Sequence, residues 1–252
     1  MKKYQLFILI YAILIILSLH SCTTYYYIPT IHNVLEFKEK GDINITTGLT
    51  EEENHFSLGY SFSDHIGFIS SYKTFRTSPD WETYRVDDYL LENELVLYKY
   101  FPENLHISVN VGYGFGEIDR NNDFLHISYN RQSILPSFGY ISKYFEFAFA
   151  IRFSRVKYDL NKYTNPPASS NKDFDEYYHI GDLGKREFYF AEPSFTIGLG
   201  YKFIKLRYQY LMLNQMGSGE IKYLENIGSL SIALRININR LFKKKEKPNQ
   251  TD

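Results

Sequence analysis

The stretch FEFAFAIRFS, residues 145–154, decides how this chain folds. Phenylalanine and isoleucine occupy its odd positions, while Glu146, two alanines, Arg152 and Ser154 occupy its even positions. Successive side chains of a β-strand point to opposite faces of its sheet. The stretch therefore predicts a strand with one apolar face and one face of polar or small side chains.

The same two-residue period returns about ten times between residues 41 and 241, most clearly in 105–116, 194–203 and 228–238. The chain holds 24 Tyr and 20 Phe, and aromatic residues favour half-buried, pleated surfaces. We therefore expect an all-β chain. The expected strands are 42–50, 54–63, 66–76, 89–101, 105–116, 125–141, 144–157, 187–202, 205–214 and 227–240.

The connections between these strands alternate between short and long. The short ones lie at 63–65, 102–104, 142–143 and 203–204, and the longer polar ones at 51–53, 77–88, 117–124, 159–186 and 215–226. Short turns on one side and long loops on the other are typical of outer-membrane barrels with an even number of antiparallel strands. The sequence predicts a transmembrane up-and-down antiparallel β-barrel of about ten strands, with eight as the alternative count.

Alternation alone does not say which face lies inside. A lipid-anchored, lipocalin-like barrel would turn its apolar faces inward around a hydrophobic ligand. In the transmembrane interpretation the polar faces line the lumen, and buried charges there must be paired. We expect such a network to plug the lumen, with a narrow polar pore as the alternative. The expected luminal charges are Glu92, Glu94, Glu146, Arg152, Lys205, Arg207 and Arg235.

The N-terminus has the layout of a lipoprotein signal peptide. Lys2 and Lys3 precede an uncharged run over 6–19, which is too short to span a membrane comfortably. The run ends in LHSC at 19–22, which resembles a lipobox and implies lipidation of Cys22; conventional cleavage is the alternative. Cys22 is the single cysteine, which excludes an internal disulfide framework and a zinc site built from cysteines.

Residues 29–42 read PTIHNVLEFKEKGD. This stretch resembles the opening of a largely uncharacterised family of Bacteroidota outer-membrane lipoproteins with β-barrel bodies. The resemblance implies a barrel in the outer membrane of a Gram-negative cell and no particular chemistry. We divide the chain into a signal peptide at 1–21, a lipidated linker at 22–40, a barrel at 41–242 and a basic, disordered tail at 243–252.

One pair of residues is a candidate for catalysis. His126 and Ser128 share one face of a strand, as a nucleophile and its base require. The pair resembles the His-x-Ser element of outer-membrane lipid A deacylases, but Tyr129 stands where that family has Asn, and the nearest carboxylate in the sequence is Asp123. A second His-Ile-Ser at 106–108 falls on the luminal face. We expect no enzymatic activity, with lipid A deacylation as the alternative.

The remaining expectations concern partners. The 28 Lys and Arg against 29 Asp and Glu give a net charge of −1, which does not favour nucleic acid, and a mean hydropathy of −0.33 excludes a polytopic helical membrane protein. The seven histidines are scattered, so we expect no metal and no cofactor. We expect outer-membrane lipid around the barrel, contact with a small molecule or protein through loop 159–186, and a structural, adhesive or envelope-interaction role.

Overall fold

The computed structural model describes residues 27–50, 53–75, 86–120, 125–163, 187–201, 203–217, 221 and 223–242. The expected signal peptide, Cys22, the tail at 243–252 and positions 164–186 of the longest expected loop lie outside the described residues.

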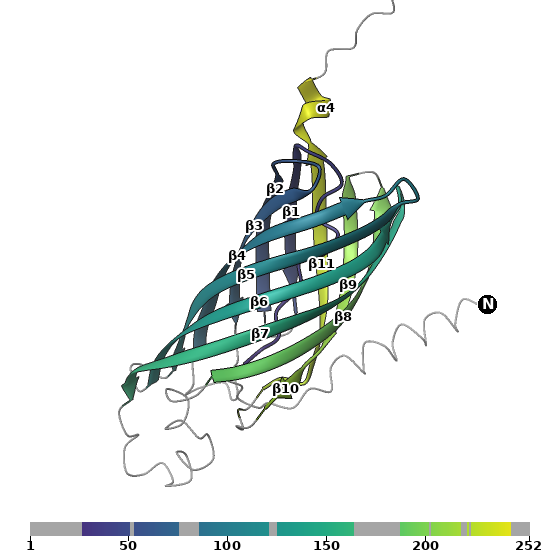
Figure 1. Cartoon of the computed structure of the whole chain (residues 1–252). Coiled ribbons are helices and arrows are strands. Elements are labelled where there is room, and N and C mark those ends of the chain that lie inside the picture. Colours follow the sequence, from purple (N-terminus) through teal and green to yellow (C-terminus); the bar gives the residue numbers. More distant parts are fainter. Residues whose placement is uncertain are drawn as a thin grey trace, which may run out of the picture.

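Ten antiparallel strands form a closed barrel (Figure 1). They are β1 (Asp42–Leu49), β2 (Glu53–Ser61), β3 (Ile66–Phe75), β4 (Val86–Tyr100), β5 (Leu105–Arg120), β6 (Leu125–Ile141), β7 (Phe145–Tyr163), β8 (Glu187–Tyr201), β9 (Ile204–Met212) and β11 (Asn226–Asn237). Neighbouring strands pair in this order, and β1 pairs with β11 to close the sheet. A three-residue strand, β10 (Asn214–Met216), follows β9 and pairs with β8. The predicted fold class and ten-strand count are confirmed.

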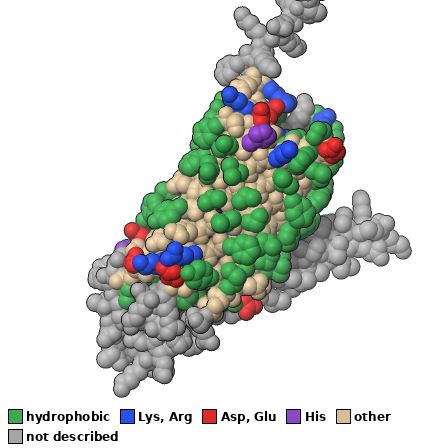
Figure 2. Space-filling model, in the orientation of Figure 1, with side chains coloured by type: hydrophobic (Ala, Val, Ile, Leu, Met, Phe, Trp, Pro, Cys, Tyr) green, Lys and Arg blue, Asp and Glu red, His purple; other side chains and the backbone are tan. Residues whose placement is uncertain are grey.

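The barrel is apolar outside, and its interior holds polar and charged side chains together with small apolar clusters. On β5, Val109 is 39% exposed, whereas His106 and Asn110 are buried; on β11, Ile232 is 51% exposed. Hydrophobic side chains cover the outer wall in Figure 2, and the charged ones gather toward its two ends. This distribution suits a sheet immersed in hydrocarbon, where only a closed barrel satisfies every backbone hydrogen bond. The lipocalin-like alternative is wrong, because its apolar faces would point inward.

The two rims differ in their connections. The short-turn rim carries the connections 62–65, 101–104, 142–144 and 202–203, and the long-loop rim carries 50–52, 76–85, 121–124, 164–186 and 217–225. Figure 1 shows β10 at the long-loop rim and helix α4 (Ile238–Phe242) at the short-turn rim. No helix among the described residues has the length and hydropathy needed to cross a membrane.

Three strands run further toward the long-loop rim than the sequence predicted. β4 begins at Val86 instead of residue 89, which shortens the connection expected at 77–88. β5 continues to Arg120 and β7 to Tyr163, so the connections expected at 117–124 and 159–186 are shorter. Ile118 and Tyr158, which lie beyond the expected strand ends, are buried in one cluster with Ile127 and Val156. Their packing gives the pairing of β5, β6 and β7 a core beyond the expected strand ends.

The last strand is shorter than predicted, because β11 ends at Asn237 and the chain turns into α4 instead of continuing as a strand to residue 240. Asn237 lies opposite Asp42, the first residue of β1, so a longer strand would have no partner there. The Asn237 side-chain oxygen accepts a hydrogen bond from the backbone N–H of Arg240, which is the role of a helix N-cap.

Candidate functional site in the barrel lumen

The lumen is filled by the chain's own N-terminal segment. Residues 27–37, which we name the plug, are buried inside the barrel, and Leu35 and Phe37 have no exposed surface. The expected linker at 22–40 therefore contains a luminal element at 27–37. The plug begins at the long-loop rim, where Tyr27 bridges Tyr223, and the chain reaches the short-turn rim at Gly41, whose N–H donates to the Ser61 carbonyl.

A carboxylate on β4 organises the plug's first half. Glu92 accepts hydrogen bonds from Lys73 Nζ at 2.8 Å and from Arg131 Nη2 at 2.6 Å. Both cations also donate to Thr30 Oγ1 of the plug, each at 3.0 Å. All of these side chains are buried. The plug hydroxyl therefore joins the acid and its two cations into one network across β3, β4 and β6.

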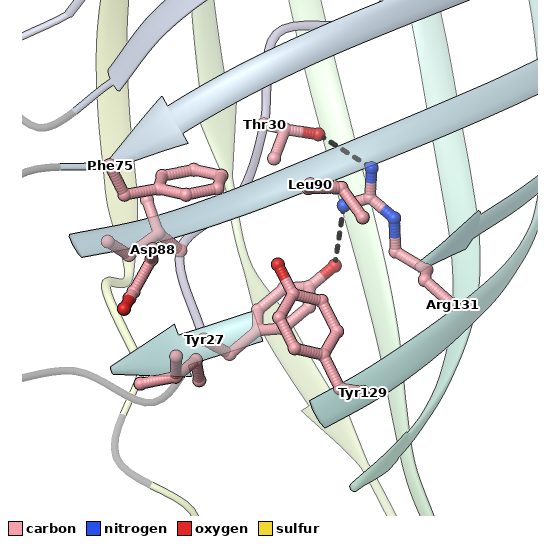
Figure 3. Close-up of a pocket in the computed structure, with 9 residues that line it drawn as sticks. Tyr27, Thr30, Phe75, Asp88, Leu90, Tyr129 and Arg131 are labelled. Carbon is pink, nitrogen blue, oxygen red and sulfur yellow. Dashed lines mark hydrogen bonds between the residues drawn. The ribbon is translucent and has the colours of Figure 1, made fainter. Parts of the chain in front are cut away.

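Beside this network lies a small cavity at the long-loop end (Figure 3). It has a volume of about 20 Å³, which is room for roughly one water molecule. Figure 3 shows Arg131 reaching toward Thr30 and the Tyr27 hydroxyl, while Tyr129 and Asp88 line the other sides. A space of this size suits solvent within the network and is too small for an organic ligand.

A second carboxylate, Glu192 on β8, sits 40 residues from its main partner, Arg152 on β7. Arg152 Nε donates to Glu192 Oε1 at 3.1 Å, and Arg152 Nη2 donates to Oε2. The Tyr27 hydroxyl of the plug and Ser154 Oγ add bonds of 2.7 and 2.8 Å to Oε1. Arg152 also donates to the Thr30 carbonyl at 3.1 Å. The wall and the plug therefore share one hydrogen-bond network here.

The middle of the plug is held by neutral groups and one acid. His32 N–H donates to Gln209 Oε1, and His32 Nδ1 lies 2.7 Å from Ser194 Oγ. One residue further along, Asn33 Nδ2 donates to Glu94 Oε1 at 3.0 Å. The backbone and side chains of the plug thus find partners on opposite walls, as buried polar groups require.

Near the short-turn rim, the plug contributes an acid of its own. Arg207 Nη1 donates to Glu36 Oε1 at 3.0 Å, and Arg207 Nε donates to Glu146 Oε1. Arg235 donates to the carbonyls of Glu36 and Leu35. Leu35 has a φ of 59°, a left-handed conformation that is strained for a bulky residue. The bonds from two guanidinium groups to its carbonyl hold this turn in place.

Phe37 at the plug's end uses space that two glycines leave open. A Cβ atom at Gly67 would stand 2.4 Å from Phe37 Cε2, and one at Gly59 would stand 2.8 Å from Phe37 Cζ. Both distances are below those that carbon atoms tolerate. The ring also packs near Tyr98, at 5.7 Å between centroids. A larger side chain at either glycine would displace the ring.

The seven charges expected in the lumen all lie on the inner wall. Glu92, Glu94, Glu146, Arg152 and Arg207 make the contacts above, Lys205 donates to the carbonyls of Ser142 and Lys143, and Arg235 donates to the plug. The sequence analysis missed Lys73, Arg131, Glu192 and Glu36. The alternation of inward- and outward-facing positions could have identified the first three, because each lies between outward-facing residues on its strand.

The catalytic candidates lie on the outside, near the long-loop rim. His126 Nδ1 is 3.3 Å from Asp119 Oδ1, the residue opposite it on β5. Their side chains are 31% and 55% exposed, and Ser128 is half-buried one step further along β6. Asp123, the carboxylate nearest in sequence, lies outside the described residues. The second His-Ile-Ser places buried His106 and Ser108 in the lumen, where Ser108 Oγ lies 2.7 Å from Ser137 Oγ.

Within the described residues, no group of three or more His, Cys, Asp or Glu side chains is placed to hold a metal ion. The seven charges expected in the lumen instead make hydrogen bonds to other charged side chains, to the plug, or to neutral groups of the wall.

No protein-family model matches the chain, and no curated protein is significantly similar to it. Three solved structures show low similarity. The translocator domain of the autotransporter NalP from Neisseria meningitidis is 7% identical, with a TM-score of 0.40 over 77% of this chain and 85% of that one. A loop-deletion mutant of OmpT, an outer membrane protein of Vibrio cholerae, is 9% identical, with a TM-score of 0.33 over 79% of this chain. The chain spans 61% of that protein's length. The NanC porin is 12% identical, with a TM-score of 0.33 over 77% of this chain and 99% of that one. The fold assignment therefore rests on this chain's own strand pairing.

Proposed function

We propose that this protein is an outer-membrane β-barrel of a Gram-negative cell, lipidated at Cys22 and closed by its own N-terminal segment, with a structural, adhesive or envelope-interaction role and no catalysis. The observation that carries the proposal is the plug, whose residues 27–37 are hydrogen-bonded to charged side chains of eight strands. Within the described residues, a lumen filled in this way supports a closed barrel without a luminal substrate pocket.

Three features support the location. The apolar outer wall needs a hydrocarbon surrounding, the connections are short at one rim and long at the other, and the N-terminal sequence resembles a lipoprotein signal. The protein should leave membranes only with detergent, and its migration on gels should change on heating. Release into buffer after removal of the acyl chains would contradict the proposal.

The plugged state is tested by conductance in planar bilayers. The full-length protein should be silent, whereas a variant lacking residues 28–37 should show discrete conductance, because that segment fills the lumen. Since this deletion can prevent folding, the variant Glu36→Ala/Phe37→Ala provides a milder test. It removes a partner of Arg207 and the ring over Gly67, and it should show brief openings. Steady conductance of the full-length protein would establish the narrow pore instead.

The largest connection, 164–186, belongs to the long-loop rim and is where contact with a protein or small molecule of the surroundings is proposed. Deleting part of it should abolish such contact without changing the heat-dependent gel shift of the barrel.

One observation favours a second candidate, lipid A deacylation. Asp119 supplies the carboxylate that His126 needs for orientation, and both lie on the lipid side of the wall with Ser128 on the same face. The test compares lipid A mass spectra from cells that express the wild type, Ser128→Ala, Asp119→Asn and the luminal control Ser108→Ala.

Our main proposal expects identical spectra in all four strains and in cells without the protein. Loss of an acyl chain that depends on Ser128 and Asp119 but not on Ser108 would show that the protein is an enzyme. The control is matched, because Ser108 ends a second His-Ile-Ser sequence but faces the lumen.

A further inference from the structure

The direction in which the plug passes through the barrel has a consequence for the N-terminus. At one end, Tyr27 stacks on Phe190 with ring centroids 4.0 Å apart, and its carbonyl accepts the Leu224 N–H at 3.1 Å. Phe190 lies near the start of β8 and Leu224 in the connection to β11, so both belong to the long-loop rim. The chain therefore enters the lumen from that rim.

The other end of this segment is fixed at the opposite rim. Lys40 N–H donates to Asp64 Oδ1 at 2.8 Å, and Lys38 N–H donates to Asp42 Oδ2 at 2.8 Å. Asp64 lies in the turn between β2 and β3, and Asp42 begins β1. The chain thus crosses the whole barrel between Tyr27 and Gly41 before the first strand starts.

Cys22 precedes Tyr27 by five residues, and a fully extended chain of five residues reaches at most about 18 Å. The apolar band of such a barrel is about 25 Å tall, and the lumen is already occupied by the plug. Cys22 consequently has no route back to the short-turn rim. The intervening residues, TTYY at 23–26, carry no charge that would oppose a place at a membrane interface.

We propose that the barrel carries its own N-terminus to the cell-surface side of the outer membrane, so that the acyl chains on Cys22 insert in the outer leaflet beside the long-loop rim. This inference rests on the proposed function, which supplies the membrane, its orientation and the lipidation. The plug then acts as a tether that links a surface lipid to a β-barrel. An anchor in the periplasmic leaflet, the simple expectation for a linker at 22–40, would require the plug to run the other way.

The test places a site for a specific protease between Thr24 and Tyr25 of the full-length protein in Gram-negative cells fed with labelled palmitate. Protease added to intact cells should cleave this site and remove the label from the barrel. The protein without the inserted protease site should keep its label, and the Cys22→Ser variant should carry none. Cleavage that occurs only after the outer membrane is permeabilised would overturn the inference.

Two further insertions separate this failure from failure of the proposed function. The same protease site between Pro102 and Glu103, in a turn of the short-turn rim, should be cut only in permeabilised cells, whereas a site within 164–186 should be cut in intact cells. If both controls behave so and the site at 24–25 is protected, the inference alone is wrong. If the controls are reversed or indistinguishable, the proposed orientation is wrong as well. Absence of label in the wild type would disprove the lipid part.

Discussion

Glu192→Gln is the sharpest test of whether the luminal network stabilises the barrel. The Glu192 carboxylate is fully buried and accepts hydrogen bonds from Tyr27, Ser154 and two nitrogens of Arg152. Glutamine keeps the shape but loses the charge, and its amide turns a donor toward a guanidinium that also donates. Removing one partner of a buried ion pair costs about 3–5 kcal/mol. The ratio of folded to unfolded protein should therefore fall roughly 10²- to 4 × 10³-fold.

The same strand provides a matched control. Glu187 on β8 pairs with Arg155 on β7 through two hydrogen bonds, as Glu192 pairs with Arg152, but both rim side chains are substantially exposed. Glu187→Gln should leave stability unchanged within experimental error, because solvent screens exposed pairs. Stability is measured by urea titration of the barrel refolded in detergent, with the heat-dependent gel shift reporting the folded fraction. Equal effects of the two substitutions would refute the argument from burial.

Two more substitutions probe the plug and the outer wall. Gly67→Ala should lower the free energy of unfolding by about 1–3 kcal/mol, because its Cβ would clash with the Phe37 ring. Adding Phe37→Leu should restore part of that loss. If the urea titration shows that the two substitutions lower stability additively, the two residues do not touch. Val109→Arg, near the middle of the apolar row of β5, should cost about 2–4 kcal/mol in lipid vesicles. Glu117→Arg on the same face near the long-loop rim should change little, and similar losses for both variants would argue against a lipid-facing wall.

Sequence alternation predicted the ten strands because each barrel strand has two different surroundings. Hydrocarbon on one side and a polar lumen on the other impose opposite residue types on successive positions, as in 145–154. The strand ends were harder to place where buried residues such as Ile118 and Tyr158 form a local core that extends the pairing. At the other rim, β11 ends at Asn237, where the pairing with β1 stops at Asp42 and the Asn237 side chain caps the following helix.

The plug could not be predicted from a pattern. A segment enclosed on all sides has no solvent face and no lipid face, so its residues follow no period. Thr30, Glu36 and Phe37 each contact a different part of the barrel wall. With Pro29 at its start, the segment has the composition of a linker. What the sequence did contain was an excess of inward charges whose partners were not obvious, and the plug supplies several of them.

The Asp119–His126 pair was missed for a different reason. In an antiparallel hairpin the numbers of opposed residues add up to a constant, and β5 and β6 pair Arg120 with Leu125, so Asp119 must face His126. The expected loop at 117–124 hid this relation, because residues assigned to a loop have no register. Only the true strand ends identify the carboxylate beside the imidazole.

The plug also bears on how the barrel closes. Its hydrogen-bond partners lie on all ten strands of the barrel, which together surround the lumen. A barrel that closed before the plug entered would keep the ion pairs within its wall but would leave Arg235 and Glu94 without their plug partners, and buried charges without partners are strongly destabilising. If the plug is in place while the strands pair, each wall charge meets its partner as it loses water. Closure and threading are then one event, and the segment before β1 is as much a part of the folded barrel as any of its strands.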